Sequence, residues 1–313
     1  MKAVVYDKKA TPFPLEMHEV AKPVPAEGEV LVKIHAVSIN AADYRSMRMG
    51  MIPKRKIYGA DIAGLIEILG EGVTKFKIGD RVFGDIMPCD FGGFAEYAAV
   101  PEGLLALLPA GVSFEDASAI PIAALTALQG LRNIGNVQRG QKVLICGASG
   151  GVGTYAVQLA KYFGAEVTAV CSPKNTGQAR SLGADHVIDY SKEDFSTAGR
   201  RYDLILAING NRSFSAYKRA LAPAGTCVMV GGALTQIIGA MLLGPIMSLG
   251  SKKIRVLAAR SDPKDLEFLI KLVKEGKIKP VIDRRYKLEE TPEAMQYASK
   301  GHASGKIVIT VAK

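Results

Sequence analysis

The glycine cluster at residues 147–153, GASGGVG, is the stretch of this chain with the clearest chemical use. It follows an apolar run at 142–146 and precedes a helical pattern, and a second apolar run at 166–171 completes a strand–helix–strand unit. A unit of about 30 residues is the length expected of a dinucleotide-binding site. Because the amides at a helix N-terminus face outward at the positive end of the helix dipole, they can bind phosphate. The pattern predicts a pyrophosphate site; the alternative is an ordinary strand-to-helix turn.

Each position of the cluster has an expected role. Gly150 lets the backbone approach the pyrophosphate, and Gly153 lets the helix pack closely on the strand. Ala148 occupies the position of the first glycine in the G-x-G-x-x-G fingerprint, so the tight turn must be made with a methyl group present. The residues expected at the phosphates are Ala148, Ser149, Gly150, Gly151, Val152 and Gly153.

The end of the second apolar run indicates which dinucleotide binds. An acidic residue there would bind the ribose hydroxyl of NAD, but the sequence after Cys171 is Ser172-Pro173-Lys174-Asn175. A hydroxyl and a cation suit the additional 2′-phosphate of NADPH, which a carboxylate would repel. We therefore expect NADPH. The alternative is that Ser172 and Lys174 only cap and solubilise the next helix.

Two kinds of secondary-structure pattern divide the chain. The first 120 residues contain short β-like runs with frequent turn signals, whereas from about residue 121 apolar strands alternate with helices. This alternation predicts βαβ units and a parallel sheet. We expect strands at 142–146, 166–171, 186–189, 203–208, 226–230 and 254–258, with helices at about 151–163, 174–182 and 213–221.

The C-terminal tail predicts helices over 263–275 and 291–299 and a last strand at 306–311. Since we recognise no partner run near this strand, we expect it to return to the N-terminal domain. The expected domains are therefore a mostly β domain, 1–120 with 261–313, and a dinucleotide-binding domain, 121–260. The fold class is α/β.

Charge and composition exclude little. A net charge of +10 over 313 residues suits anionic ligands, but Lys and Arg are scattered and no aromatic and basic RNA motif is present, so we do not expect nucleic-acid binding. The apolar segment 237–250 is short for a membrane span and predicts a pocket lining or a subunit contact. The N-terminus lacks a signal-peptide pattern and the four cysteines are widely spaced, which indicates a cytoplasmic protein.

Besides the glycine cluster, seven stretches match a known family: VSINAADYR (37–45), residues 58–84, GGFAEYAAVP (92–101), residues 117–131, SLGADHVIDY (181–190), LAPAGTCVMVGG (221–232) and SGKIVITV (304–311). By these stretches the chain resembles the medium-chain dehydrogenase/reductase superfamily, and within it the zinc-free quinone oxidoreductase branch. The resemblance implies a doubly wound Rossmann sheet plus a GroES-like catalytic domain, and a homodimer formed through the edge strand at 254–258.

The same resemblance implies that zinc is not used. Zinc-dependent relatives bind catalytic zinc with a Cys, a His-Glu pair and a further Cys or His, whereas here Asn40 stands at the first Cys position and Gly59-Ala60-Asp61 replaces Gly-His-Glu. A catalytic zinc site needs three protein ligands, which these positions do not supply. We expect no metal.

Without a Lewis acid, a conjugated acceptor such as a quinone or an α,β-unsaturated carbonyl is the easier hydride acceptor, because charge delocalises onto an oxygen that needs only hydrogen-bond donors. Asn40 and Tyr44 are the candidate donors, and Asp43 is expected to orient its neighbours. By resemblance, further cofactor contacts are Thr126, Tyr190, Gly231, Gly232 and Lys306.

Two other functions remain open. The apolar stretch 233–250 would suit a reductase of enoyl-thioester or lipid-like enones. The third possibility is a non-catalytic NADPH- or RNA-binding protein.

Overall fold

The computed structural model describes residues 1–11, 13–210, 212–232, 239 and 250–311. The chain forms two compact units. The first unit comprises Met1–Leu125, Ser261–Gly276 and Pro280–Lys313, and the second comprises Thr126–Arg260 and Lys277–Lys279. The segment predicted as a pocket lining or subunit contact, 237–250, falls largely outside the described residues.

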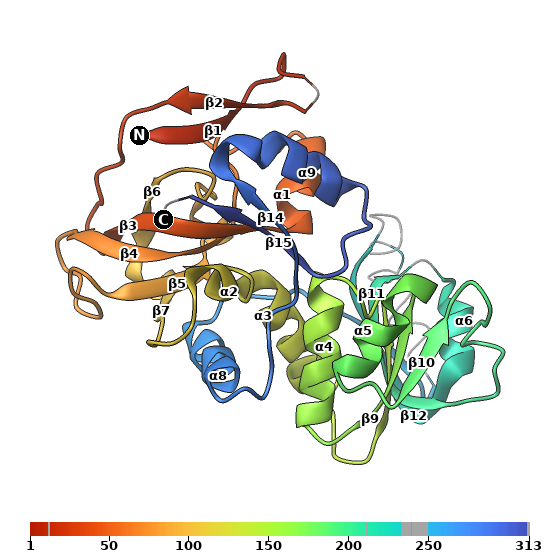
Figure 1. Ribbon diagram of the computed structural model, residues 1–313. Helices are drawn as coiled ribbons and strands as arrows, with labels where there is room; N and C mark the ends of the chain where they lie inside the picture. Colours follow the sequence, from red (N-terminus) through yellow and green to blue (C-terminus); the bar gives the residue numbers. More distant parts are fainter. Residues whose placement is uncertain (12, 211, 233–238, 240–249, 312–313) are drawn as a thin grey trace. The chain divides into compact units, whose positions relative to one another are not determined.

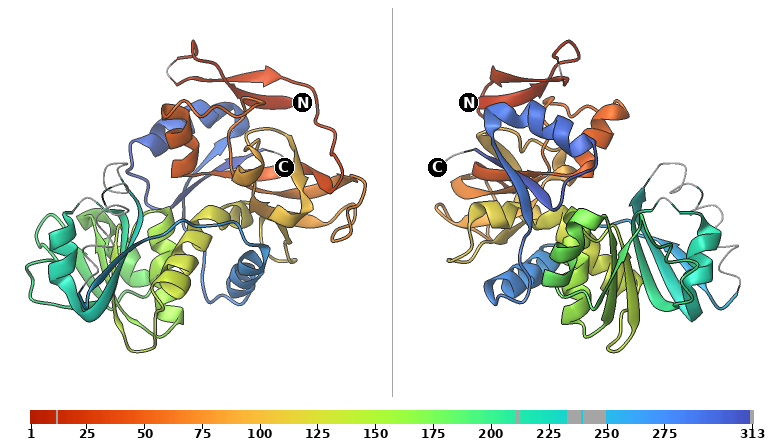
Figure 2. Two further views of the ribbon diagram at one scale, coloured as in Figure 1. Left: turned by 180° about the vertical axis from the view of Figure 1, so that it is seen from behind. Right: turned by 45° about the vertical axis from the view of Figure 1, so that its right-hand side comes forward.

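The second unit is a parallel sheet in the Rossmann strand order. Among the described residues its six strands lie in the order β10-β9-β8-β11-β12-β13, and every neighbouring pair is parallel. This is the doubly wound order 3-2-1-4-5-6, which places its switch point between β8 and β11. Figure 2 shows α4 and α6 on opposite faces of the sheet. The elements are β8 (Lys142–Cys146), α4 (Gly151–Tyr162), β9 (Glu166–Cys171), α5 (Thr176–Ser181), β10 (His186–Asp189), β11 (Tyr202–Gly210), α6 (Phe214–Ala220), β12 (Leu221–Gly232) and β13 (Lys253–Val256).

All six strands predicted for this region are present. The prediction succeeds because buried parallel strands are continuous apolar runs, which are easy to recognise in a sequence. Two are longer than expected: β11 includes Asn209 and Gly210, and β12 begins at Leu221. The helix expected at 174–182 is a short 3₁₀ turn, Pro173–Asn175, followed by α5.

The first unit is built on a mostly antiparallel sheet. Its path within the described residues is β14-β15-β3-β4-β5-β7, with β6 paired to β3, and β1 and β2 form a separate hairpin. In Figure 1, α1 and α9 lie close together beside this sheet, and α2 packs on β3 and β4. The elements are β1 (Lys2–Tyr6), β2 (Leu15–Glu19), β3 (Glu29–Ile39), α1 (Ala41–Arg48), β4 (Asp61–Leu69), β5 (Arg81–Asp85), β6 (Tyr97–Pro101), β7 (Leu105–Leu107), α2 (Phe114–Ser118), α3 (Pro121–Gln129), α8 (Pro263–Lys274), β14 (Ile282–Lys287), α9 (Thr291–Ser299) and β15 (Lys306–Thr310).

The last strand pairs with the N-terminal part of the chain, as predicted: β15 runs antiparallel to β3. The premise that it lacks a nearby partner is wrong, because β14 pairs with β15 in parallel. The sequence of β14, IDRRYK, is charged and lies at the edge of the sheet, so it lacks the apolar pattern that identifies a strand.

No helix in the described part of the chain is long and apolar enough to cross a membrane.

Candidate active site

The glycine cluster forms the turn between β8 and α4. Gly147 has a φ of 77°, in the left-handed region that favours glycine, so the tight turn lies one residue before Ala148. This position accounts for an alanine where the fingerprint has its first glycine. A Cβ atom on Gly147 would also lie 2.8 Å from the carbonyl oxygen of Ile208 in β11.

The other two glycines differ in what surrounds them. A Cβ atom on Gly153 would collide with the carbonyl oxygen of Gly147 and lie 2.7 Å from the Cα of Ala148, so the helix can pack on the loop only without a side chain there. A Cβ atom on Gly150 would meet only Gly147 O at 3.7 Å. The first helical bond runs from Thr154 N to Gly150 O at 2.9 Å, which leaves the preceding amides outside the helical ladder. Open space beside Gly150 and outward-facing amides fit a pyrophosphate.

Three side chains predicted to bind the cofactor lie at the carboxyl ends of neighbouring strands. Ser172 and Lys174 follow β9, and Tyr190 follows β10. The amide of Tyr190 donates to Cys171 O at 3.3 Å, which ties the two strand ends together, and the Ser172 hydroxyl accepts from Asn175 Nδ2 at 3.1 Å. Lys174 and Tyr190 are exposed.

Gly231 and Gly232 end β12, and Gly232 is in register with Gly210 at the end of β11. Because all these strands are parallel, these glycines lie at the same edge of the sheet as the glycine cluster, where such folds bind ligands. Thr126 is buried in α3, and Lys306 is the first residue of β15 in the first unit.

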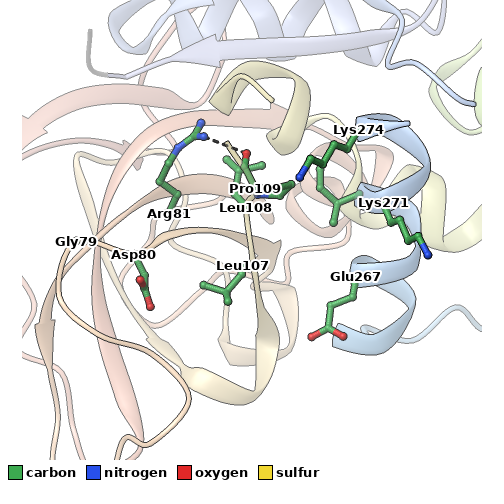
Figure 3. A pocket seen from close by; sticks show the side chains of 10 residues that line it. Gly79, Asp80, Arg81, Leu107, Leu108, Pro109, Glu267, Lys271 and Lys274 are labelled. Atoms are coloured by element: carbon green, nitrogen blue, oxygen red, sulfur yellow. Dashed lines mark hydrogen bonds between the residues drawn. The ribbon is translucent and has the colours of Figure 1, made fainter. Parts of the chain in front are cut away.

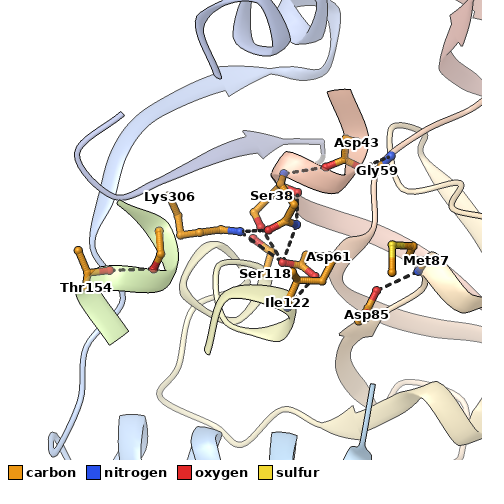
Figure 4. Close-up of polar contacts among 12 residues, drawn as sticks. Ser38, Asp43, Gly59, Asp61, Asp85, Met87, Ser118, Ile122, Thr154 and Lys306 are labelled. Carbon is orange, nitrogen blue, oxygen red and sulfur yellow. Dashed lines mark hydrogen bonds and ion pairs between the residues drawn. The ribbon is translucent and has the colours of Figure 1, made fainter. Parts of the chain in front are cut away.

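Asp43 holds the backbone around the candidate catalytic loop. Asp43 lies in the first turn of α1 and is fully buried. Its carboxylate accepts hydrogen bonds from Asn40 N at 2.7 Å and from Gly59 N at 3.1 Å (Figure 4). Its contacts therefore suit the orienting role expected of it. Tyr44, in the same helix, is half-buried, with the Arg48 guanidinium 5.6 Å from its ring centre.

The Asn40 side chain is bonded at both ends of its amide. Its oxygen accepts from Lys306 Nζ at 2.5 Å, and its nitrogen donates to Asp61 Oδ2 at 2.9 Å and to Ser38 O at 3.4 Å (Figure 4). In this conformation the amide is engaged with the protein.

Asp61 is the hub of these contacts. Its carboxylate also accepts from Ser38 Oγ at 3.2 Å and from Ile122 N at 3.0 Å, in the first turn of α3, and Lys306 Nζ lies 3.4 Å away. One carboxylate thus joins β3, β4, β15 and α3. We name the set Ser38, Asn40, Asp61 and Lys306 the Lys306 cluster.

Burial shapes the charges in and around this cluster. Desolvation raises the pKa of Asp43 to about 7 and that of Asp85, which faces Asp61 across β4 and β5, also to about 7. Desolvation likewise raises the pKa of Asp61, while Lys306 opposes this increase. It lowers the pKa of Lys306, against the attraction of Asp61. Asp43 and Asp85 therefore take up protons near neutral pH, whereas Asp61 is the buried carboxyl group that lies beside the Lys306 ammonium.

Sequence reasoning missed Ser38 and Asp85, and it did not connect Lys306 with Asn40. Asp85 ends the buried run Arg81–Asp85, and an acidic residue closing an apolar run was the available signal. For the contact between Lys306 and Asn40 the sequence offered none.

No group of three or more His, Cys, Asp or Glu residues within the described ranges could hold a metal ion. The cysteines are free, and Cys146, Cys171 and Cys227 are buried.

A surface pocket of about 570 Å³ lies elsewhere in the first unit, between β7 and α8 (Figure 3). Its Arg81 guanidinium is already bonded to the carbonyl oxygens of Pro109 and Val112, at 3.1 and 2.6 Å. No predicted site residue lines it.

Comparison with known proteins places the chain in a family. Residues 26–110 match the model of the alcohol dehydrogenase GroES-like domain, and residues 182–309 match the model of zinc-binding dehydrogenases. The chain is 36% identical to the chloroplast envelope quinone oxidoreductase homolog of Arabidopsis thaliana, over 94% of this chain and 93% of that protein. The chain belongs to the medium-chain dehydrogenase/reductase superfamily, in its quinone oxidoreductase branch.

Two further similarities agree with this family. The chain is 31% identical to the chloroplastic NADPH-dependent alkenal/one oxidoreductase of Arabidopsis thaliana, over 99% of this chain and 79% of that protein. The solved structure of the quinone oxidoreductase from Coxiella burnetii matches with a TM-score of 0.90 and 30% identity, over 99% of both chains. A Rossmann-type oxidoreductase of this family implies a nicotinamide cofactor.

Proposed function

We propose that this protein is an NADPH-dependent oxidoreductase that transfers hydride to a quinone or an α,β-unsaturated carbonyl without a metal. The observation that carries the proposal is the glycine cluster, with open space at Gly150 and close packing at Gly153. The similarity to proteins named quinone oxidoreductase and alkenal/one oxidoreductase supports the substrate class.

In this proposal the amides of residues 151–153 bind the pyrophosphate, because the Gly150 amide already donates to Gly147 O at 3.2 Å, and Gly150 leaves room for the phosphates. Ser172, Lys174 and Tyr190 bind the 2′-phosphate side of the cofactor. When bound, the cofactor supplies a hydride. Lys174 and Tyr190 are exposed at the ends of their strands, which suits a contact with a charged ligand. Gly231, Gly232 and Thr126 remain proposed cofactor contacts.

The proposed catalytic residues belong to the first unit. Asn40 and Tyr44 would donate hydrogen bonds to the acceptor oxygen, and Asp43 would keep the loop and helix in place. For Asn40 to do so, its amide nitrogen must exchange its longer donor bond, to Ser38 O at 3.4 Å, for the substrate while it keeps the bond to Asp61 at 2.9 Å. The segment after α1 exposes Met49, Met51 and Ile52, which suits an apolar substrate.

Independence from zinc rests on Asn40 and Ala60, whose side chains replace two ligand positions of the zinc-dependent relatives. We also propose a homodimer through β13, which ends the sheet of the second unit, and a cytoplasmic location. The plant relatives named above are chloroplast proteins. The alternative of an enoyl-thioester reductase rests on the apolar stretch 233–250, which lies outside the described residues apart from 239 and 250.

The test is direct. Purified protein is titrated with NADPH and with NADH by calorimetry, and NADPH oxidation is followed by absorbance with quinones, enones and simple aldehydes. We expect tighter binding of NADPH and turnover of quinones or enones, with metal chelators having no effect. Failure of folded protein to bind NADPH would overturn the proposal.

A further inference from the structure

The chain buries an ammonium group against the amide of a proposed catalytic residue. Lys306 is 3% exposed, Asn40 is 6% exposed and Asp61 is fully buried. Taking a lysine out of water costs free energy unless its charge is paired and its hydrogen bonds are made. The contacts of Lys306 Nζ with Asn40 Oδ1 and Asp61 Oδ2 offset this cost, and both partners come from the opposite end of the chain.

These two partners leave the Asn40 amide one orientation. An ammonium group can only donate hydrogen bonds, so it must face the amide oxygen, and an ionised carboxylate can only accept them, so it must face the amide nitrogen. Lys306 and Asp61 therefore oppose rotation of the amide by 180°, since the flipped form would set donor against donor and acceptor against acceptor.

The backbone fixes the position of Lys306 itself. It is the first residue of β15, its amide donates to Val281 O at 2.7 Å, and the next residue, Ile307, is in register with Ile39 of β3. Gly305 precedes it with a φ of 141°, and a Cβ atom there would collide with the carbonyl oxygen of Val281. The lysine thus enters the cluster from a strand whose start allows little movement.

Asp61 is fixed just as firmly. It is in register with Ser38 of β3, and Ser38 Oγ and Ile122 N both donate to its carboxylate. Both charged groups that face the amide are therefore supported by backbone that does not depend on Asn40.

We propose that Lys306 is a positioning residue, whose ammonium acts with Asp61 to hold the Asn40 amide in the orientation that the reaction uses. This inference rests on the proposed function, because it needs Asn40 to contact the substrate. It differs from the cofactor contact that family resemblance implies for Lys306, and the two roles predict different kinetics.

The experiment is a double-mutant cycle on the full-length protein. The variants are Asn40→Ala, Lys306→Met and Asn40→Ala/Lys306→Met, with Lys271→Met as the control, since Lys271 is a lysine of the same unit whose side chain is 72% exposed. Steady-state kinetics are measured with NADPH and the best quinone or enone found for the wild type. Residues that act through one another give non-additive effects, whereas independent residues give effects that multiply.

We expect Asn40→Ala and Lys306→Met each to lower kcat by about tenfold or more, with the KM for NADPH changing less than kcat. The kcat of the double variant should lie within about twofold of the kcat of the slower single variant. Lys271→Met should match the wild type.

Two results would overturn the proposal while leaving the proposed function intact. One is a double variant whose loss of kcat equals the product of the single losses. The other is a Lys306→Met variant with an increased KM for NADPH and an unchanged kcat, which would indicate a cofactor contact. Absence of turnover by the wild type with every acceptor would overturn the proposed function, and the positioning role with it.

Lys306→Met leaves Asp61 buried without its cation and can prevent folding. The cycle is then measured in an Asp61→Asn background, which removes the uncompensated charge. In that background the fold losses of kcat caused by Lys306→Met and Asn40→Ala should still not multiply in the combined variant. Losses that do multiply would count against the positioning role.

Discussion

The glycine cluster and the Lys306 cluster are polar sites built from different groups, backbone amides in the first and side chains in the second. The first is a run of consecutive residues that presents backbone amides, and its geometry depends on the absence of side chains at Gly147 and Gly153. The second joins side chains from β3, the N-terminus of α1, β4 and β15, with Asn40 and Lys306 separated by 266 positions in sequence, and its geometry depends on buried charge. The first should therefore be sensitive to added volume, and the second to lost charge and to pH.

The largest expected effect is on the charge side of this comparison. Asp61→Ala should lower the free energy of unfolding by about 3–5 kcal/mol, because it leaves the Lys306 ammonium buried without its carboxylate. Urea unfolding measures the change. Asp61→Asn/Lys306→Met should recover much of this loss, and a double variant as unstable as Asp61→Ala would mean that charge is not what the cluster depends on.

The corresponding change in the glycine cluster adds volume without charge. Gly153→Val should weaken NADPH binding on the order of a hundredfold, about 2.7 kcal/mol, because the side chain would separate α4 from the loop. Calorimetry measures binding, and circular dichroism checks that the fold remains. Gly103→Ala is the matched control, since nothing lies within 4 Å of the added Cβ atom. Unchanged affinity in Gly153→Val would refute the close-packing argument.

A charge change at the cofactor edge sharpens the comparison within the second unit. Lys174→Asp should lower the ratio of kcat/KM for NADPH over NADH by about tenfold or more, because a carboxylate repels the 2′-phosphate. Steady-state assays with both cofactors give the ratio. If it does not move, the preference for NADPH does not depend on Lys174.

The smallest expected effect is on pH dependence, which should arise in the first unit. The pKa values of Asp43 and Asp85 are raised to about 7, so between about pH 4 and pH 7 the folded protein holds protons that the unfolded chain releases. Stability from these groups is therefore fully present below about pH 4 and is lost as the pH rises through 7. Each pH unit in this window is worth at most about 1.4 kcal/mol per group.

Asp85→Asn should accordingly reduce the fall in unfolding free energy between pH 5 and pH 7 by about 1–2 kcal/mol, measured by urea unfolding at both values. Glu71→Gln, at an exposed carboxylate, is the control and should leave the fall unchanged. An identical fall in Asp85→Asn and wild type would show that Asp85 ionises normally.

Prediction from sequence worked where the signal is local. The buried strands of the second unit are apolar runs of a recognisable length, and the six expected runs are all strands. It worked less well where context decides: the charged edge strand β14 was missed, and the short helices α1 and α2 lie within a stretch read as mostly β. The same division holds for the candidate site. The glycine cluster can be recognised in seven consecutive residues, whereas Ser38 is an ordinary polar residue within β3 and the signal at Asp85, an acidic residue at the end of β5, is weak.

The amino-acid sequence by itself determined the turn at residues 147–153, the alternation of strands and helices that gives a parallel sheet around it, and the presence of Asn40 where zinc-dependent relatives carry a ligand. These features depend on neighbouring residues and on backbone freedom, which a linear pattern records. Only the tertiary structure decided that Lys306 places its ammonium on the Asn40 amide beside Asp61. That contact exists because β15 pairs with β3 and the cluster excludes water, and both are consequences of packing the whole first unit.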